Sequence, residues 1–174
     1  MNVLPLSSRR VIVVGIDGSP SSVAALQLAA GLVPLAGNAI DAVTAWQYPL
    51  VFGLYTPMDW NYEELAGQAL DQALLDAFPD GCPCTIERRL LNGSPAQILI
   101  EESRDASMVV VGSRGHGGFS GLLLGSVSST VAERAQCPVL VSHGTPQLPE
   151  DQLEADTASD HRTGIVAGAE RVLA

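Results

Sequence analysis

Short apolar runs alternate with longer segments of helical spacing along the first 144 residues. The apolar runs predict five strands, at Val11–Gly15, Ala39–Trp46, residues 85–91, Met108–Gly112 and residues 138–142. The segments between them predict four helices, which begin after Ser19, at Asn61, after Ser94 and at Gly125. Strict alternation of strands and helices predicts an α/β fold, with a parallel sheet covered on both faces by right-handed crossovers.

Local chemistry supports the predicted helix ends. Ser19 is expected to cap the first helix, with Pro20 at its first position, and Ser94-Pro95 repeats this pair. Asn61 with Glu64 resembles a capping box. Apolar stripes predict which faces of the first two helices are buried: Ala24, Leu28 and Leu32 in the first, and Leu65, Ala69, Ala73 and Leu74 in the second. Charges in residues 85–91 place that strand nearer a sheet edge.

Two inner apolar strands end in loops that can carry chemistry. These loops read Gly15-Ile16-Asp17-Gly18 and Gly112-Ser113-Arg114-Gly115, and ligands bind at the carboxyl ends of such strands. Glycines allow backbone N–H groups to approach an anion closely, and Gly125-Ser126 adds a helix N-terminus. The loops therefore predict a polyphosphate site. The alternative, that the glycines only make tight or flexible turns, stays open at this point.

The charge balance excludes several classes of protein. The chain has 19 acidic residues and nine basic ones, all of them arginine, for a net charge of −10. Without lysine it can form neither a Walker phosphate loop nor a Schiff base, and it cannot be a response-regulator receiver. Few, scattered arginines predict no binding to nucleic acid and no attraction to an anionic membrane.

The cysteines and the two ends of the chain indicate where the protein resides and how it is divided into domains. Cys82, Cys84 and Cys137 lack the spacing of a redox C-x-x-C or a usual zinc pair, so we expect reduced thiols. The start of the chain lacks the order of a signal peptide, and no apolar run reaches the about 20 residues of a membrane span. We therefore expect a cytoplasmic protein, with a domain at residues 1–144 and an acidic, disordered tail at residues 145–174. A short helix is predicted within the tail, at residues 165–173.

The spacing Gly112-x2-Gly115-x9-Gly125-Ser126 resembles the nucleotide-binding signature of the universal stress protein family. Other motifs agree, in order along residues 9 to 143. They are Val13-Val14-Gly15-Ile16-Asp17-Gly18-Ser19, Val43-Thr44-Ala45-Trp46 with Thr44 where the family often has His, Asn92-Gly93-Ser94-Pro95, and Cys137-Pro138-Val139-Leu140-Val141. The acidic tail has no counterpart in this pattern.

The resemblance implies a Rossmann-like, doubly wound sheet in the order 3-2-1-4-5 and a homodimer that pairs the last strands. It also implies ATP binding, with Mg²⁺ carried by the phosphates. Carried over by position, Gly15, Ile16 and Asp17 line the adenosine pocket, and the backbone at Ala45 meets the adenine edge. The remaining expected contacts, with the ribose and the phosphates, come from Val111, Gly112, Arg114, Gly115, Gly125, Ser126 and Val127.

Individual residues keep alternative interpretations. Asp17 is expected to contact the ligand, but aspartate also caps turns well. Arg114 contacts phosphate or is a solvated loop charge, and His116 is a weaker candidate for either phosphate or metal. No catalytic constellation is evident, so we expect a nucleotide-loaded regulatory module with an unknown protein partner. The alternatives are a weak ATPase or nucleotide hydrolase, a cyclic AMP binder, and an interaction protein that needs no nucleotide.

Overall fold

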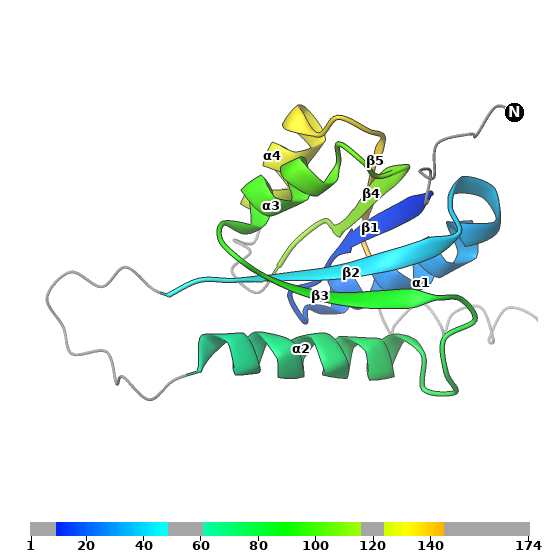
Figure 1. Cartoon of the computed structure of the whole chain (residues 1–174), viewed down its shortest axis with the longest axis horizontal. Helices are drawn as coiled ribbons and strands as arrows, with labels where there is room; N and C mark the ends of the chain where they lie inside the picture. Colours follow the sequence, from blue (N-terminus) through cyan, green and yellow to red (C-terminus); the bar gives the residue numbers. More distant parts are fainter. Residues whose placement is uncertain (1–9, 49–60, 116–123, 145–174) are drawn as a thin grey trace, which may run out of the picture.

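Five strands alternate with four helices in the computed structural model, which describes residues 10–48, 61–115 and 124–144 (Figure 1). In chain order the elements are β1 Val11–Gly15, α1 Pro20–Ala36, β2 Ala39–Trp46, α2 Tyr62–Ala77, β3 Ile86–Asn92, α3 Pro95–Glu102, β4 Met108–Gly112, α4 Ser126–Arg134 and β5 Val139–Ser142. All four strand pairs are parallel, and the sheet order is β3-β2-β1-β4-β5. The predicted α/β fold and strand order are confirmed. The predictions for the tail and for His116 lie outside the described residues.

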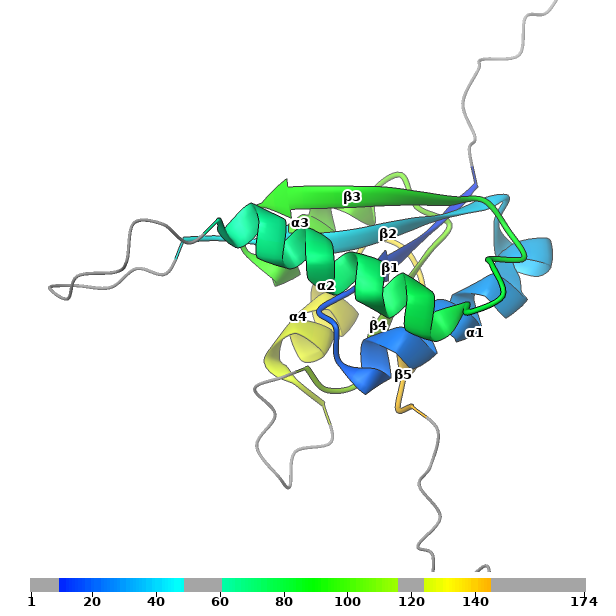
Figure 2. The same cartoon turned by 90° about the horizontal axis from the view of Figure 1, so that it is seen from below.

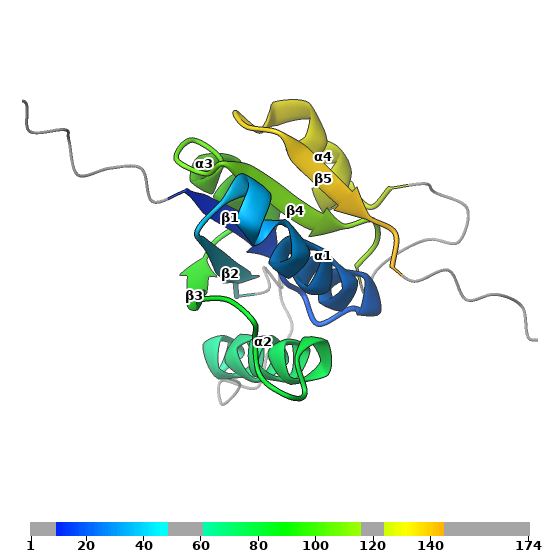
Figure 3. The same cartoon turned by 90° about the vertical axis from the view of Figure 1, so that its right-hand side faces the viewer.

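The sheet separates two helical layers. Seen nearly along the strands, α1 and α2 cover one face, and α3 and α4 cover the other (Figure 3). The view from below shows α1 and α2 in front of the sheet (Figure 2). Successive side chains of a strand point to opposite faces, so each inner strand supplies both layers. No helix in the described part of the chain combines the length and apolar character that crossing a membrane requires.

The core under α1 and α2 is filled by large aliphatic side chains. Ile12, Leu26, Ile40 and Leu70 are fully buried there. Four residues of the predicted helix stripes are not part of this core. Ala24 and Ala69 are half-buried outside it, Leu28 is 39% exposed and Leu65 is 48% exposed. The first two helices carry apolar residues on several sides, so more than one stripe fits the spacing. Packing against the sheet selects the faces that are buried: Ser22, Ala25, Leu26 and Ala29 in α1, and Gly67, Leu70, Ala73 and Ala77 in α2.

The core under α3 and α4 consists mainly of valines from the sheet. Val13, Val109 and Val111 point to this face, and Leu99 of α3 and Val131 of α4 pack on them. These two helices are short, with eight and nine residues. They therefore cover this face of the sheet with fewer turns than the 17 and 16 residues of α1 and α2 provide on the other.

The four helices differ in how their N-termini are capped. The side chain of Ser19 accepts a hydrogen bond from the N–H of Ser22 at 3.3 Å, and Asn61 Oδ1 accepts one from Glu64 at 3.2 Å. Both predicted caps are confirmed. Ser94 also lies at the predicted cap position of α3, but neither its side chain nor Gly125 at α4 provides a cap hydrogen bond. Side chains thus satisfy the first amides of α1 and α2 only.

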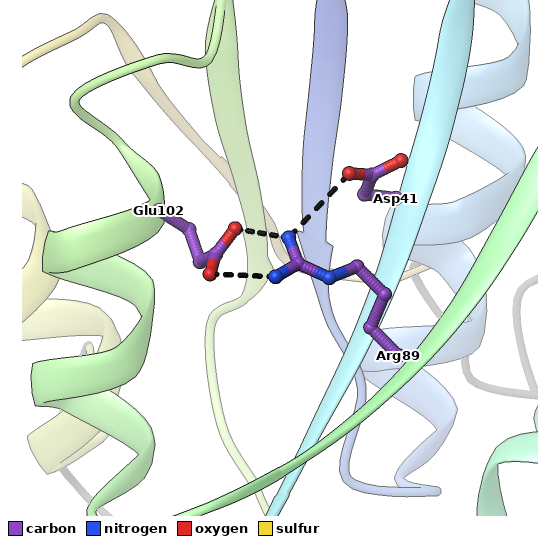
Figure 4. A network of polar contacts seen from close by, with 3 residues as sticks. All are labelled: Asp41, Arg89 and Glu102. Carbon is purple, nitrogen blue, oxygen red and sulfur yellow. Dashed lines mark hydrogen bonds and ion pairs between the residues drawn. The ribbon is translucent and has the colours of Figure 1, made fainter.

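A polar cluster fixes α3 to the sheet (Figure 4). Arg89 of β3 donates from both terminal nitrogens to the Glu102 carboxylate, with Nη2 at 3.0 Å from Oε1. Its Nη1 also lies 3.6 Å from Asp41 Oδ2 on β2. The hydrogen bonds to Glu102 raise the pKa of Arg89, against the opposing effect of burial. The guanidinium therefore stays charged and joins the last turn of α3 to two strands.

The edge position predicted for residues 85–91 from their charges is confirmed. β3 is at one end of the sheet, and its Glu87 and Arg88 side chains are exposed. β5 is at the other end and is the shortest strand described, with four residues. Pro138 lies just before β5, where its carbonyl accepts from the N–H of Val109 at 2.9 Å. Trp46, the last residue of β2, is half-buried, and its ring meets that of Tyr48 edge to face with centroids 5.5 Å apart.

Candidate functional site

A cavity of about 540 Å³ opens at the carboxyl ends of β1 and β4, within the size range of small-molecule sites. It lies where the strand order reverses, because the chain leaves β1 toward α1 on one face and leaves β4 toward α4 on the other. All eleven residues predicted for a site line this cavity: Gly15, Ile16, Asp17, Ala45, Val111, Gly112, Arg114, Gly115, Gly125, Ser126 and Val127. The structure therefore brings together predicted residues as far apart in the sequence as Gly15 and Val127.

The floor of the cavity is apolar. Val43 and Ala45 of β2, Val111 of β4 and Leu99 of α3 contribute it. The absence of a side chain at Gly15 allows α3 to approach the sheet, because a Cβ at this position would lie 2.8 Å from Leu99 Cδ1. The resulting surface can accept the face of a flat, weakly polar group.

Asp17 stands at the mouth of the cavity and serves the fold as well. Its Oδ1 accepts from the N–H of Ser19 at 3.0 Å and from Ser19 Oγ at 2.6 Å. Gly18 follows with φ of 82°, a conformation that side chains rarely adopt. The second carboxylate oxygen lies against Gly115, which has no side chain to displace it. The predicted capping role is therefore present, and Asp17 lines the cavity at the same time.

The loop after β4 is held against the start of α1. Its Arg114 carbonyl accepts from Ser21 Oγ and, at 3.3 Å, from Ser19 Oγ. A Cβ at Gly112 would lie 2.8 Å from the backbone carbon of Ser21, so the fold itself requires glycine there. The Arg114 side chain is exposed, and among the described residues no acidic group pairs with it. One positive charge is thus available at the cavity rim.

The N-terminus of α4 faces the cavity through Gly125, Ser126 and Val127. The N–H of Gly125 donates to the Ser113 carbonyl at 2.7 Å, which Ser128 Oγ also approaches at 3.1 Å. The first helical hydrogen bond runs from Ser129 to the Gly125 carbonyl at 3.0 Å. The N–H groups of residues 126–128 precede that bond and have no side-chain cap. They form an electropositive end suited to an anion.

Gly125 is not explained by the fold. Its φ of −73° and ψ of 166° suit any residue. A Cβ there would meet Ser113 O at 3.5 Å and Arg114 Cα at 3.6 Å, which are ordinary contacts. A side chain would instead project beside the uncapped amides of α4. The glycine keeps these amides open to whatever enters the cavity.

The sequence did not identify the remaining lining residues. These are Ser22, Val43, Pro95, Leu99, Leu124 and Ser128. Val43 could have been found, because it precedes Ala45 by two positions and so shares its face of the sheet. Pro95 and Leu99 depend on how α3 packs over Gly15, which no local motif specifies. Pro95 also brings a second uncapped helix end, that of α3, to the cavity.

The cavity lining offers two kinds of surface for a ligand. Its apolar floor and its row of backbone donors suit a flat group that carries an anion. Among the described residues, no cluster of three or more His, Cys, Asp or Glu side chains could hold a metal ion. Within the same ranges the exposed His143 lies outside the cavity lining.

Comparison with known proteins gives consistent relatives. The chain is 39% identical to a universal stress protein of Mycolicibacterium smegmatis over 137 residues, which cover 77% of this chain and 46% of that protein. It is 33% identical to the universal stress protein Rv2623 of Mycobacterium tuberculosis, over 81% of this chain and 48% of that one. The chain therefore spans about half the length of these curated relatives.

Solved structures support the fold. The universal stress protein UspA from Lactobacillus plantarum aligns over 79% of this chain and 99% of its own, with a TM-score of 0.61 and 20% identity. A universal stress protein crystallised in complex with cAMP aligns over 80% and 100%, with a TM-score of 0.50 and 29% identity. The sequence model of the universal stress protein family matches residues 8–143, which include the whole sheet and the cavity lining. The chain belongs to the universal stress protein family.

Proposed function

We propose that this protein binds an adenine nucleotide, ATP, in the cavity between β1 and β4 and acts as a nucleotide-loaded regulatory module. The observation that carries the proposal is the uncapped N-terminus of α4, which opens into the cavity through Gly125, a glycine that the fold does not require. Backbone amides and a helix dipole hold phosphate without lysine, which this chain lacks.

The two ends of the cavity would take the two ends of the nucleotide. In the proposal the base lies on the apolar floor of Val43, Val111 and Leu99, with its edge at the backbone of Ala45. Gly15, Ile16 and Asp17 line the adenosine part, and the Asp17 carboxylate accepts from a ribose hydroxyl or approaches a metal shell. The phosphates lie against Gly112, Gly115 and Gly125 and against the free amides of residues 126–128, with the Arg114 side chain at the rim.

A divalent cation fits this site best as part of the ligand. The described residues offer no protein cage for a metal, and Mg²⁺ prefers phosphate oxygens and water. The chain has a net charge of −10, and the Asp17 carboxylate lies beside the proposed phosphate site. Mg²⁺ bound to the phosphates would reduce the repulsion between this carboxylate and the polyanion.

Cyclic AMP is the second candidate ligand. The relative of known structure in complex with cAMP, 29% identical over 80% of this chain, favours it. Both ligands share adenosine and would use the same floor. They differ at the phosphate end, where cAMP has one phosphate with a single charge and ATP has three.

Isothermal titration of the full chain tests the proposal. Protein stripped of nucleotide is titrated with Mg-ATP, with cAMP and with Mg-GTP as the control for base selectivity. We expect one-to-one binding of Mg-ATP with a Kd below 1 mM and weaker binding of Mg-GTP. The absence of heat at millimolar ATP contradicts ATP as the ligand. If cAMP alone binds, the phosphate part of the proposal is wrong and the adenosine part stands. Sustained release of phosphate from ATP would show that the protein is an ATPase and not a binding module.

A homodimer is part of the proposal. β5 is an edge strand of the described sheet, and its Val139, Leu140 and Val141 are only half-buried. Exposed apolar edges are usually covered, and a second copy paired along β5 would cover this one. Light scattering is expected to give twice the chain mass of 18.1 kDa. A single-chain mass at all concentrations contradicts the dimer.

The regulatory role requires a partner that distinguishes loaded from empty protein. We place nucleotide binding in residues 1–144 and assign the acidic residues 145–174 to another task. Removing residues 145–174 is therefore expected to leave ATP affinity unchanged. A cytoplasmic location, where ATP is abundant, completes the proposal, and cell fractionation tests it.

A further inference from the structure

Two cysteines approach each other at the sheet edge opposite the cavity. Cys82 and Cys84 lie in the segment that joins α2 to β3, at the amino end of that strand (Figure 1). Their sulfur atoms are 3.3 Å apart. The N–H of Cys84 donates to Cys82 Sγ at 3.4 Å, which fixes the position of that sulfur. Neither residue lines the nucleotide cavity.

The sulfur separation suits a disulfide better than a metal. The sulfurs of a disulfide are about 2.0 Å apart, so the distance between these two sulfurs has to shorten by about 1.3 Å. Two thiolates on a tetrahedral zinc ion, each at about 2.3 Å, would be about 3.8 Å apart. Among the described residues no third metal-binding side chain completes a site with these two.

The two thiols have different environments. Cys82 is exposed to solvent, whereas Cys84 is half-buried and packs against the core under α1 and α2. Burial, with a smaller contribution from Cys82, raises the pKa of Cys84 from 9.0 to about 12. The accessible sulfur is thus Cys82, and Cys84 is a protonated neighbour within reach of it.

We propose that Cys82 and Cys84 form a reversible intrachain disulfide when the protein meets a hydroperoxide. The Cys82 thiolate attacks one peroxide oxygen, an S–O bond forms, the O–O bond breaks, and the leaving hydroxide takes up a proton to become water. The sulfur of Cys84 then attacks Cys82, an S–S bond forms, and the S–O bond breaks. The proton of Cys84 and the leaving hydroxide give the second water. Two thiols lose two electrons in total, and one hydrogen peroxide becomes two waters.

Proximity favours this product over others. Cys84 is two residues from Cys82, so its effective concentration exceeds that of any thiol on another chain. Cys137 precedes β5 and packs in the core under α3 and α4, on the other face of the sheet. It is therefore the internal control, a third thiol of the same chain with no partner cysteine beside it among the described residues.

Thiol counting on the full-length protein tests the inference. The reduced chain is treated with hydrogen peroxide, unfolded, alkylated with iodoacetamide and weighed intact. We expect the number of alkylated cysteines to fall from three to one and to return to three after dithiothreitol. Cys137→Ser should fall from two to none. Cys84→Ser should stop at a sulfenic acid on Cys82, which dimedone traps, whereas Cys82→Ser should give no dimedone adduct.

Several outcomes would overturn the assignment. A count that stays at three, or a fall of the same size in Cys84→Ser, excludes the intrachain bond. A product that runs as a disulfide-linked pair of chains on a non-reducing gel points to exchange between molecules. One equivalent of zinc that survives desalting and blocks alkylation of both cysteines would assign the pair to a metal instead.

Discussion

The two faces of the sheet are built differently. Under α1 and α2, long helices with side-chain caps cover a filled aliphatic core. Under α3 and α4, short helices without side-chain caps cover a smaller valine-rich core, and a cavity of about 540 Å³ opens beside them. Both faces are built from the same strands, because alternate side chains of each strand point to opposite sides.

The difference indicates a division of labour between the faces. A cap such as Ser19 or Asn61 satisfies amides that would otherwise need water, and so it stabilises its helix. A helix end without one leaves its amides open to water or to a ligand. We infer that α1 and α2 mainly stabilise the fold, whereas the N-termini of α3 and α4 serve binding. Four predictions separate these roles.

The largest expected effect is on the filled core. Leu70→Ala removes a fully buried side chain of α2 and should lower the free energy of unfolding by about 2 to 5 kcal/mol. Leu99→Ala on the other face should fall at the lower end of that range, since Leu99 already borders the cavity. Chemical denaturation of both variants measures the difference. A larger loss for Leu99→Ala would contradict the division between the faces.

Next in size is the effect of a side chain at the uncapped helix end. Gly125→Val should weaken Mg-ATP binding about 100-fold or more, about 2.7 kcal/mol, because its methyl groups project beside the amides of α4. Stability should fall by at most about 1 kcal/mol, since the backbone there suits any residue but an N-cap position prefers glycine to valine.

The matched control is Gly31→Ala, in the exposed side of α1. A Cβ at Gly31 meets nothing within 4 Å, so this variant should bind ATP as the natural protein does. It should also gain about 1 kcal/mol of stability, since alanine favours helices over glycine. ATP titration and chemical denaturation are carried out on both Gly125→Val and Gly31→Ala. Normal ATP affinity in Gly125→Val would show that this helix end does not bind the phosphates.

Removal of the divalent cation should have a smaller effect. With excess EDTA we expect ATP affinity to fall about tenfold, about 1.4 kcal/mol, because the phosphates then face the Asp17 carboxylate and a chain of net charge −10 with less compensation. The titration is repeated with Asp17→Asn, in which the dependence on EDTA should shrink. Equal affinity with and without EDTA in the natural protein would show that the electrostatic argument is wrong.

The smallest effects come from the caps themselves. Ser19→Ala should destabilise the protein by about 1 kcal/mol, because it removes the cap hydrogen bond to Ser22 and the contact with Asp17. Ser94→Ala at the start of α3 should cost only a few tenths of a kcal/mol, since Ser94 makes no cap hydrogen bond. Thermal unfolding of the two variants distinguishes them, and equal losses would mean that α3 is capped in solution.

Local chemistry explains what could be predicted from the sequence. The caps at Ser19 and Asn61, the strand positions and the edge position of β3 follow from interactions a few residues apart. The exposed Leu28 and Leu65 were placed wrongly in the core, because the sheet selects the buried face of a helix that is apolar on several sides. Pro95 and Leu99 were missed because the path of α3 over Gly15 is a long-range packing result.

The central claim is that nucleotide phosphates bind the uncapped amides of α4. Amide NMR spectra of the ¹⁵N-labelled full chain, recorded during titration with Mg-ATP, test it most directly. We predict the largest shifts at the N–H groups of Ser126, Val127 and Ser128, with those at the capped start of α2, Glu63 and Glu64, unchanged. Shifts confined to other parts of the chain, or none at millimolar Mg-ATP, would contradict the claim.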